Sequence, residues 1–411
     1  MNTDRIIRNQ QQTFANLFAQ LRPLIRTDRI FPARLQKLLA SNPSFGSRDR
    51  RLYRELLYTA VRYLPWVEPQ FDRDEQGGVC LVAWLSAEIP ATQKFKALPD
   101  WSIVSGHDLS LTDKSAFLAK KFRSDTFSPD TLLPAWFREQ CPEAYSEPEL
   151  SSLLNRAPLW LRLQISDSSD IFPELAERNW PVRRSSILES AIEVLTEADV
   201  TTTQAYQNGQ VEIQDLGSQL LLETCGLELG GRWLDACAGA GGKTLQLAQL
   251  LGPSGAIDAY DVRPQALSEL SLRARRAGLR TIRTLSREPT QVYDGVLVDA
   301  PCSGSGTWRR APHLKWQTTP ERMANAAQLQ KELLNKFSSR VRPGGTLIYA
   351  TCSLCSQENE DVVKIFLSEH PEFELKPLAK TFDFSVGPYG LTILPARLNS
   401  DGFFVSQLRK S

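Results

Sequence analysis

Two cysteines in this 411-residue chain stand in short motifs whose residue types suit covalent catalysis. One motif reads Asp-Ala-Pro-Cys-Ser-Gly over residues 299–304, and the other reads Tyr-Ala-Thr-Cys-Ser over residues 349–353. Each follows an apolar, strand-like run, so Cys302 and Cys352 are expected just beyond strand ends, where open α/β sheets form their ligand sites. A thiolate there can add to a flat, electron-poor ring, and carbon-5 of a pyrimidine is not alkylated without such help.

A glycine-rich turn upstream of both cysteines predicts a nucleoside-binding site. Residues 235–243 read Asp-Ala-Cys-Ala-Gly-Ala-Gly-Gly-Lys after a short apolar strand. Glycines let the backbone approach a ligand, and the helix that follows offers free N–H groups. The spacing fits neither the dinucleotide fingerprint nor a phosphate loop. Asp261 ends the next strand, where a carboxylate accepts hydrogen bonds from ribose hydroxyls. Because no second phosphate-binding device follows, the pattern also fits S-adenosylmethionine.

The other cysteines predict neither a disulfide framework nor a zinc site. The chain has seven cysteines, an odd count that is untypical of disulfide-built secreted domains. Cys80, Cys141 and Cys225 are expected to be buried and inert. Cys352 and Cys355 form a Cys-x-x-Cys, but zinc needs about four ligands and only three histidines are present. We therefore expect no metal and a reducing cytoplasm.

The net charge of +1 conceals two basic segments. Residues 1–56 hold eleven Lys or Arg against four Asp or Glu, and residues 263–287 hold seven Arg against one Glu. Two such segments favour a polyanionic partner, because Arg and Lys make most phosphate contacts. The first residues do not read as a charged-then-apolar leader, and no apolar run is long enough to span a bilayer, so we expect no membrane association.

Hydrophobic periodicity predicts three domains. Residues 1–130 begin with helical spacing, which recurs before Pro65, whereas residues 72–125 have no clear period. Residues 131–225 combine a helical start with an alternating strand at 159–163, as in a small α+β module. Residues 226–411 alternate strands and helices like a doubly wound α/β domain. Strands are expected at 232–236, 256–260, 296–298, 347–349 and 402–408, and helices at 243–251, 264–278 and around 329–337.

Taken together, these motifs resemble the Sun/Fmu (Nop/Sun) family of S-adenosylmethionine-dependent RNA cytosine-carbon-5 methyltransferases. The matching segments are 235–243, Asp261, 299–304, 349–353 and the Asp-Gly-Phe-Phe of 401–404. Upstream, segments 155–162 and 211–215 are similar to the pre-catalytic module of that family. Segments 48–50 and 56–62 resemble the NusB-like helical domain of its bacterial ribosomal RNA members. The resemblance implies a Rossmann-like class I methyltransferase domain at 226–411, a pre-catalytic RNA-binding module at 131–225, and a NusB-like RNA-binding domain at 1–130.

The resemblance also implies a role for each motif residue. Cys352 would attack carbon-6 of cytosine, Cys302 would assist breakdown of the adduct, and Asp299 would lie beside the ring and near the methionine end of the cofactor. The cofactor would be held by Cys237, Ala238, Gly239, Ala240, Gly241, Gly242, Lys243 and Asp261. A flat base must leave its stack to react, so a single-stranded or remodelled RNA, ribosomal rather than transfer RNA, is the expected partner of a monomeric enzyme.

Basic and aromatic residues just after the Pro-Cys motif are expected to contact that RNA. Arg309, Arg310 and Lys315 would bind phosphates, and His313 and Trp316 stand with them.

Two departures from the family pattern bear on cofactor binding. Ala240 stands where the family usually has proline, which loosens the turn but keeps its glycines. After the third strand the family tends to place an aspartate near the adenine, whereas residues 283–287 hold no carboxylate, so no residue is assigned to adenine.

Two other functions compete with an RNA cytosine methyltransferase. A DNA cytosine methyltransferase would use the Pro-Cys thiol, but Ser303 stands where that family has Gln, and Cys352 would have no role. A catalytically silent ribosome-assembly factor would not need two intact cysteine motifs.

Overall fold

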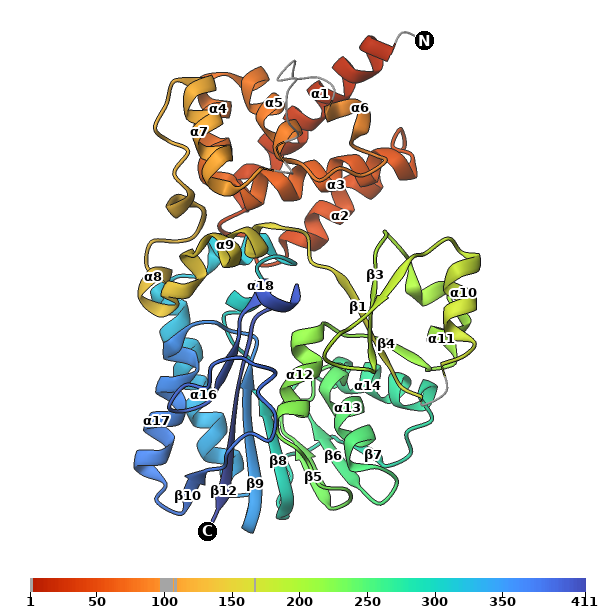
Figure 1. Ribbon diagram of the computed structural model, residues 1–411, viewed down its shortest axis with the longest axis vertical. Helices are drawn as coiled ribbons and strands as arrows, with labels where there is room; N and C mark the ends of the chain where they lie inside the picture. The colour runs from red at the N-terminus through yellow and green to blue at the C-terminus, as the bar shows by residue number, and fades with distance from the viewer. Residues whose placement is uncertain (1–2, 97–105, 107–108, 166–167) are drawn as a thin grey trace. The chain divides into compact units, whose positions relative to one another are not determined.

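The computed structural model describes residues 3–96, 106, 109–165 and 168–411, and the chain divides into two compact units (Figure 1). A helical unit comprises Met1–Arg156 together with Trp308–Thr319. An α/β unit comprises Ala157–Thr307 and Pro320–Ser411. These bounds differ from the predicted boundaries at 130 and 225, because residues 131–156 pack with the N-terminal helices and residues 157–225 with the α/β domain.

The helical unit contains only helices among its described elements. The predicted break at Pro65 is confirmed: α3 (Ser47–Arg62) ends before it, and α4 (Leu64–Arg73) begins with Pro65 in its first turn. A proline fits there because the first helical N–H groups have no partner within the helix. The other helices of the unit are α1 (Thr3–Leu21), α2 (Phe31–Ser41), α5 (Glu75–Leu85), α6 (Gln93–Lys96), α7 (Leu111–Phe122), α8 (Phe137–Gln140), α9 (Glu147–Leu154) and α15 (Pro312–Gln317), with 3-10 turns η1 (Arg22–Leu24), η2 (Pro129–Leu132) and η3 (Pro142–Tyr145).

The α/β unit begins with a small antiparallel sheet of four strands in the order β2-β3-β1-β4. The strand predicted at 159–163 is confirmed as its central member β1 (Leu159–Leu163). Its apolar side chains pack with those of α10 (Ile171–Glu177) in a separate small core. The remaining elements are β2 (Val182–Arg184), β3 (Ala191–Val194), β4 (Val211–Ile213), the 3-10 turn η4 (Val200–Thr202) and α11 (Gln204–Gln207).

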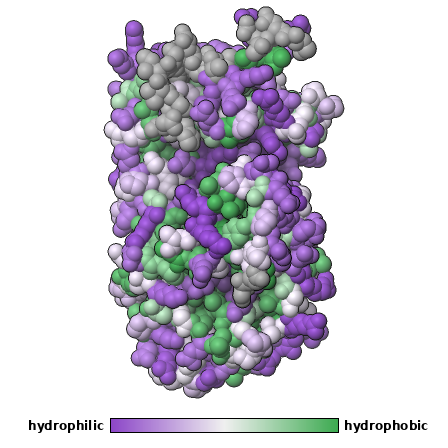
Figure 2. All heavy atoms as spheres, turned by 45° about the vertical axis from the view of Figure 1, so that its right-hand side comes forward, coloured by the Kyte–Doolittle hydropathy of each residue, from purple (hydrophilic) through white to green (hydrophobic). Residues whose placement is uncertain are grey.

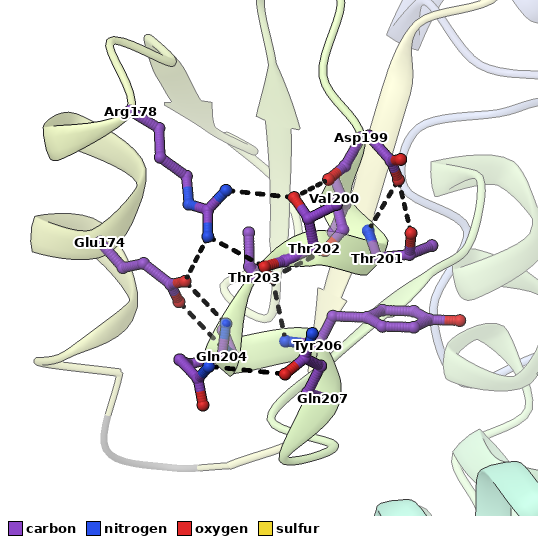
Figure 3. A network of polar contacts seen from close by, with 11 residues as sticks. Glu174, Arg178, Asp199, Val200, Thr201, Thr202, Thr203, Gln204, Tyr206 and Gln207 are labelled. Atoms are coloured by element: carbon purple, nitrogen blue, oxygen red, sulfur yellow. Dashed lines mark hydrogen bonds and ion pairs between the residues drawn. The ribbon is translucent and has the colours of Figure 1, made fainter.

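A polar network closes this small module at α10, η4 and α11 (Figure 3). The Glu174 carboxylate accepts hydrogen bonds from the backbone N–H groups of Gln204, at 2.7 Å, and Ala205, at 3.0 Å. These are first-turn N–H groups of α11, which have no partner within that helix. Arg178 donates to Thr202 Oγ1 at 3.1 Å and bonds back to Glu174. The contacts are internal to the module and give it a fixed shape.

The large sheet has eight strands in the order β10-β12-β9-β8-β5-β6-β7, with β11 paired to β12. Strands β9, β8, β5, β6 and β7 are mutually parallel, whereas β10, β11 and β12 are antiparallel additions. All five predicted strands are confirmed within it. The bounds are β5 (Arg232–Asp235), β6 (Ala256–Tyr260), β7 (Ile282–Leu285), β8 (Tyr293–Asp299), β9 (Val341–Thr351), β10 (Phe373–Leu375), β11 (Leu391–Ile393) and β12 (Phe403–Lys410).

Helices cover both faces of this sheet, as the doubly wound prediction requires (Figure 1). One face packs against α12 (Leu216–Thr224), α13 (Gly242–Leu251) and α14 (Pro264–Arg276). The other face packs against α16 (Pro320–Ser338) and α17 (Glu360–Glu369). The short elements are α18 (Pro395–Leu398) and the 3-10 turns η5 (Ser305–Thr307) and η6 (Ser356–Glu358). The predicted fold class, a Rossmann-like α/β domain with a small α+β module and a helical N-terminal region, is confirmed.

The surface is of mixed polarity. Figure 2 shows one face, on which hydrophilic side chains predominate and hydrophobic ones occur in groups between them. In the described part of the chain, no helix is both long enough and apolar enough to cross a membrane.

Candidate active site

The parallel strands bring the predicted site residues to one edge of the large sheet. Strands β5, β6, β8 and β9 run in the same direction, so their carboxyl ends share that edge. The glycine turn follows β5, Asp261 follows β6, Asp299 ends β8, and the two cysteines follow β8 and β9. Residues that are far apart in the sequence therefore form one candidate site within the α/β unit.

The glycine turn has a backbone that only glycine adopts easily. Gly239 and Gly241 have φ of 53° and 93°, and α13 begins at the next residue. A Cβ on Gly241 would lie 2.6 Å from Leu270 Cγ. A Cβ on Gly242, the first residue of the helix, would meet nothing within 4 Å, so there is open space beside this residue. The turn keeps this shape with Ala240 in place of proline, and the Ala240 carbonyl accepts a hydrogen bond of 2.7 Å from Arg273.

Asp261 is held by the turn itself. Its carboxylate accepts hydrogen bonds from the N–H of Gly239, at 2.8 Å, and of Arg263, at 2.8 Å. The Arg263 guanidinium adds two further bonds at 2.9 and 3.0 Å. Burial alone would raise the pKa of Asp261, but these hydrogen bonds and the Arg263 charge lower it. Because the Arg263 side chain is 67% exposed, ligand hydroxyls can replace its guanidinium at a cost of about 1 kcal/mol or less.

A partly buried ion pair joins the glycine turn to the end of β8. Lys243 Nζ lies 2.8 Å from Asp299 Oδ2. Burial alone would lower the pKa of Lys243, but the charge and hydrogen bond of Asp299 outweigh it and raise that pKa. Negative charge on the Cys352 sulfur would raise the pKa of Lys243 further. Lys243 is therefore a stable cation beside both Asp299 and the second cysteine.

Asp235, at the end of β5, is a different kind of carboxyl group. It is buried and accepts a hydrogen bond of 2.7 Å from Thr244 Oγ1. Burial is the main cause that raises the pKa of Asp235 to about 7. The Thr244 hydrogen bond opposes this rise, and the nearby charge of Asp299 adds to it. We infer that it ties the strand to the start of α13 rather than contacting a ligand.

The two cysteine sulfurs lie side by side, with Cys302 Sγ 3.3 Å from Cys352 Sγ. The pKa of the Cys302 thiol is raised, first by its hydrogen bond with Cys352, then by burial and by the charges of Cys352 and Glu358. Either sulfur can donate the hydrogen bond between them. The Lys243 ammonium interacts electrostatically with Cys352, whereas the Glu358 carboxylate acts on Cys302. The two chemically identical side chains therefore have different surroundings.

The cysteine loops are fastened to each other and to the Asp401–Phe404 motif. Gly306 N–H donates to the Cys352 carbonyl at 3.0 Å, and Gly402 N–H donates to the Gly306 carbonyl at 2.8 Å. A Cβ on Gly306 would lie 2.0 Å from the Gly402 carbonyl oxygen, so the close approach requires glycine. Sequence reasoning missed the buried Glu358 beside these loops, although the repeated Cys-Ser dipeptide was a signal for it.

The expected RNA contacts at Arg309 and Lys315 do not agree with the structure. Both side chains are only 1% exposed, because Trp308–Thr319 packs inside the helical unit. Lys315 Nζ donates to the Arg62 carbonyl at 2.9 Å, and Arg309 donates to the Arg156 carbonyl at 2.9 Å. Burial and the charge of Arg62 lower the pKa of Lys315 well below its usual range. Both residues stabilise the unit, and only the exposed Arg310 stays a candidate for RNA contact.

The two aromatic residues of the same segment are also structural. His313 stacks on Phe31 with ring centroids 5.6 Å apart, and burial lowers the pKa of His313 to about 4. Trp316 Nε1 donates to the Val61 carbonyl at 2.7 Å.

Fewer arginines of the basic segment 263–287 are available to contact a polyanion than its charge indicates. Four of its seven arginines form ion pairs within the α/β unit: Arg263 with Asp261, Arg273 and Arg276 with Glu212, and Arg283 with Asp258. The other three, Arg275, Arg280 and Arg287, are exposed. They are the part of this segment that is placed to meet a polyanion.

The chain is similar to known methyltransferases. The family description "16S rRNA methyltransferase RsmB/F" matches residues 224–409. A protein named probable ribosomal RNA small subunit methyltransferase B from Bacillus subtilis is 30% identical over 300 residues, which is 68% of this chain and 67% of that protein. A protein of the same name from Synechocystis is 27% identical over 440 residues, 96% of this chain and 98% of the relative.

A solved structure has the same fold over two thirds of the chain. NSun6 from Pyrococcus horikoshii, determined with SFG, an analogue of S-adenosylmethionine, has a TM-score of 0.60 and 17% identity, and the match covers 67% of this chain and 97% of that one. The glycine turn, the open space beside Gly242 and the Asp261 carboxylate fit such a nucleoside. The chain therefore belongs to the RsmB/F (Sun) family of rRNA methyltransferases, and S-adenosylmethionine is its cofactor.

Proposed function

We propose that this protein methylates carbon-5 of a cytosine in ribosomal RNA through a covalent adduct between Cys352 and the base. The observation that carries the proposal is the distance of 3.3 Å between Cys302 Sγ and Cys352 Sγ beside the Lys243–Asp299 ion pair. Two thiols at one point suit a reaction that first forms and then breaks a carbon–sulfur bond. Family membership supports the coarser activity, and the cysteine geometry supports this finer chemistry.

Each thiol has its own step. Cys352 adds to carbon-6 of cytosine, and the electrons of the 5,6 double bond make carbon-5 nucleophilic. Lys243 favours the attacking thiolate by its charge. After methylation water takes the proton of carbon-5, and the electrons of that C–H bond re-form the 5,6 double bond. The Cys352–carbon-6 bond breaks as its electron pair leaves on the Cys352 sulfur, which restores the aromatic ring. Cys302 assists this release by donating its thiol proton to the departing sulfur, 3.3 Å away, and regains a proton from water.

Asp299 holds the base while these bonds change. Its carboxylate is 27% exposed at the end of β8, and its second oxygen is not engaged by Lys243. We assign to it the edge of the cytosine, where it stabilises a proton on the ring nitrogen as the adduct forms. This role requires the base to leave its stack, so the reacting cytosine is in a single-stranded or remodelled RNA segment.

The cofactor is held by the glycine turn and Asp261. When bound, S-adenosylmethionine supplies an electrophilic methyl group. The backbone of residues 237–242 and the N-terminus of α13 would hold it, with Lys243 and Asp299 assigned to its methionine end. Asp261 would accept hydrogen bonds from its ribose hydroxyls.

Ribosomal RNA is preferred as substrate because the relatives that cover this chain are named for the small subunit of the ribosome. A DNA cytosine methyltransferase would leave Cys352, the better-placed nucleophile, without a role. A silent assembly factor would not need an ion pair between Lys243 and Asp299 next to a thiol. A cytoplasmic location and a monomeric state stay predictions.

One experiment separates these functions. The protein is incubated with methyl-labelled S-adenosylmethionine and, in parallel, with small-subunit ribosomal RNA, transfer RNA and duplex DNA. We expect label only in ribosomal RNA, and bisulfite sequencing of that RNA should place it at carbon-5 of one cytosine. Label in DNA, label at another atom, or no transfer with intact RNA and with partly assembled subunits would contradict the proposal.

A further inference from the structure

Each of the two site cysteines is followed by a serine, and both serines bind the same buried carboxylate. Ser353 Oγ donates to Glu358 Oε2 at 2.5 Å, and Ser303 Oγ donates to the same oxygen. The Ser303 N–H donates to Glu358 Oε1 at 2.7 Å. Glu358 lies in η6 and is 0% exposed. One side chain thus joins the loop after β8 to the loop after β9.

Glu358 is itself fixed to the sheet. Gln330 of α16 donates to its Oε1 at 3.1 Å, and Tyr349 OH of β9 donates to its backbone carbonyl at 2.5 Å. The next residue, Asn359, accepts from Thr351 Oγ1 at 2.6 Å and donates to the Ser353 carbonyl at 2.9 Å. The carboxylate is therefore a rigid point to which both cysteine loops are attached.

The strength of this attachment follows from its charge and burial. A carboxylate that accepts four hydrogen bonds away from water gives bonds about twice as strong as those between neutral groups. The loops it joins carry reacting groups beyond the strand ends, where chains are otherwise the most mobile part of an α/β domain. A shift of a reacting group by about 1 Å can cost a hundredfold in rate.

We propose that Glu358 is a positioning residue that clamps the two cysteine loops together and so holds the sulfurs of Cys302 and Cys352 at one point. Its catalytic meaning rests on the proposed function, but the clamp is a property of the free protein. It can be measured without RNA and without S-adenosylmethionine.

The charge of Glu358 has a second effect on the same pair. Together with the hydrogen bond to Cys352 and burial, it raises the pKa of the Cys302 thiol. The clamp thereby keeps Cys302 protonated while Lys243 favours negative charge on Cys352.

Two substitutions at Glu358 separate the effect of its hydrogen bonds from the effect of its charge. Glu358→Gln keeps the size of the side chain. Its carbonyl oxygen can accept from the Ser303 N–H and Gln330, and its amide can donate to the two serine hydroxyls, which rotate to accept. Glu358→Ala removes all four bonds. Should Glu358→Ala fail to fold, the double variant Ser303→Ala with Ser353→Ala cuts both hydroxyl bonds and leaves the carboxylate in place. Glu193→Ala removes a buried carboxylate from β3 that touches neither loop and is the matched control.

Phenylarsine oxide is the probe, because trivalent arsenic bonds two neighbouring thiols and releases water. Its dissociation constant is measured for each free protein by competition with a dithiol, and peptide mass spectrometry identifies the bridged pair. A Cys302→Ser variant should lose the bridge. We expect binding within about threefold of the wild type for Glu358→Gln and Glu193→Ala, and at least about tenfold weaker for Glu358→Ala and the double serine variant.

A second measurement tests the effect of the Glu358 charge on the reactivity of Cys302. In a Cys352→Ser background, the alkylation rate of Cys302 by iodoacetamide is measured near pH 8. Glu358→Gln should speed it, by about tenfold for each unit that the pKa of Cys302 falls. Unchanged arsenical binding in Glu358→Ala, or in the double serine variant where Glu358→Ala does not fold, would overturn the clamp. A wild type that binds the arsenical but methylates no cytosine would refute the proposed function and leave the clamp standing.

Discussion

Cys302 Sγ and Cys352 Sγ lie 3.3 Å apart, although 50 positions separate the two residues in the chain. They follow neighbouring parallel strands, β8 and β9, and the hydrogen bond between Gly306 and the Cys352 carbonyl holds their loops in register. The pair is asymmetric, since Cys302 has a raised pKa and Cys352 lies in the field of Lys243. Under the proposed function, this asymmetry fits Cys352 as the attacking thiol and Cys302 as the thiol that assists release.

The two cysteine variants should differ in kind. Cys352→Ala should form no covalent RNA adduct and transfer no methyl group, because no thiol remains to add to carbon-6. Cys302→Ala should still add and methylate but release RNA slowly, so an adduct should accumulate. Denaturing gels with labelled RNA measure this directly.

Cys355→Ala is the control for these variants. Cys355 is buried with its sulfur 3.5 Å from Ser305 Oγ. The Cys355→Ala variant should therefore methylate and release RNA at close to the wild-type rate. Normal turnover by Cys302→Ala would refute the division of labour between the two thiols.

Asp299→Asn should lower kcat by about a hundredfold or more, because it removes a charged partner of both the base and Lys243. The pKa of Lys243 should fall as well, since burial then acts against its charge without the compensation of Asp299. Asp294→Asn, in the same strand but near its start, loses the ion pair with the exposed Arg342. Its remaining carbonyl oxygen can still accept the hydrogen bond from the Arg232 N–H, so kcat should be unchanged. Steady-state methyl transfer at saturating cofactor tests both.

Gly241→Ala should destabilise the α/β unit by about 1–3 kcal/mol, because the residue has φ of 93° and its Cβ would lie 2.6 Å from Leu270 Cγ. Gly242→Ala adds the same methyl group where nothing lies within 4 Å, so it should leave stability unchanged. Calorimetric Tm values compare the two. Equal Tm values would mean that the turn is not strained as described.

The buried Asp235 should make stability depend on pH in a defined window. Its pKa is about 7 in the folded protein against 3.8 as the ordinary value, so between about pH 4 and pH 7 the folded state binds more protons than the unfolded state. Stability from this group is therefore full below pH 4 and is lost as the pH rises to 7. Asp235→Asn should flatten that part of the profile of Tm against pH, and an unchanged slope would contradict the assignment.

The exposed arginines of segment 263–287 and the buried Lys315 should affect RNA binding differently. Replacing Arg275, Arg280 and Arg287 by Ala should weaken RNA binding and reduce the slope of log affinity against log salt. With fewer phosphate contacts, fewer counterions are released from the RNA when the protein binds. Lys315→Met should lower Tm but leave that slope unchanged, since Lys315 is buried in the helical unit. The opposite pattern would restore Lys315 as an RNA contact.

Much of the fold could be predicted because local sequence patterns indicate its strands and helices. The apolar runs before Asp235, Asp261, Asp299 and Cys352 have strand length, and the segments between them have helical period, so a parallel sheet follows. Parallel strands then bring the residues after their carboxyl ends together. The candidate site could be named from the sequence for that reason, even though its residues span more than a hundred positions.

Non-local packing decided the rest. The basic and aromatic pattern of residues 308–319 fits a phosphate-binding loop as well as it fits a buried helix. In the structure, side chains of this segment donate hydrogen bonds to the carbonyl groups of Val61, Arg62 and Arg156, so the segment is part of the helical core. The boundary at residue 156 has the same origin.

The sequence by itself determined which residues could react and at which edge of the sheet they would meet, because strand length and period are local properties. The family resemblance implied different roles for the two cysteines, and only the tertiary structure shows how their surroundings differ. The sulfur distance, the Lys243 charge beside Cys352 and the Glu358 clamp all depend on side chains from separate loops, and no local pattern specifies the distance between them.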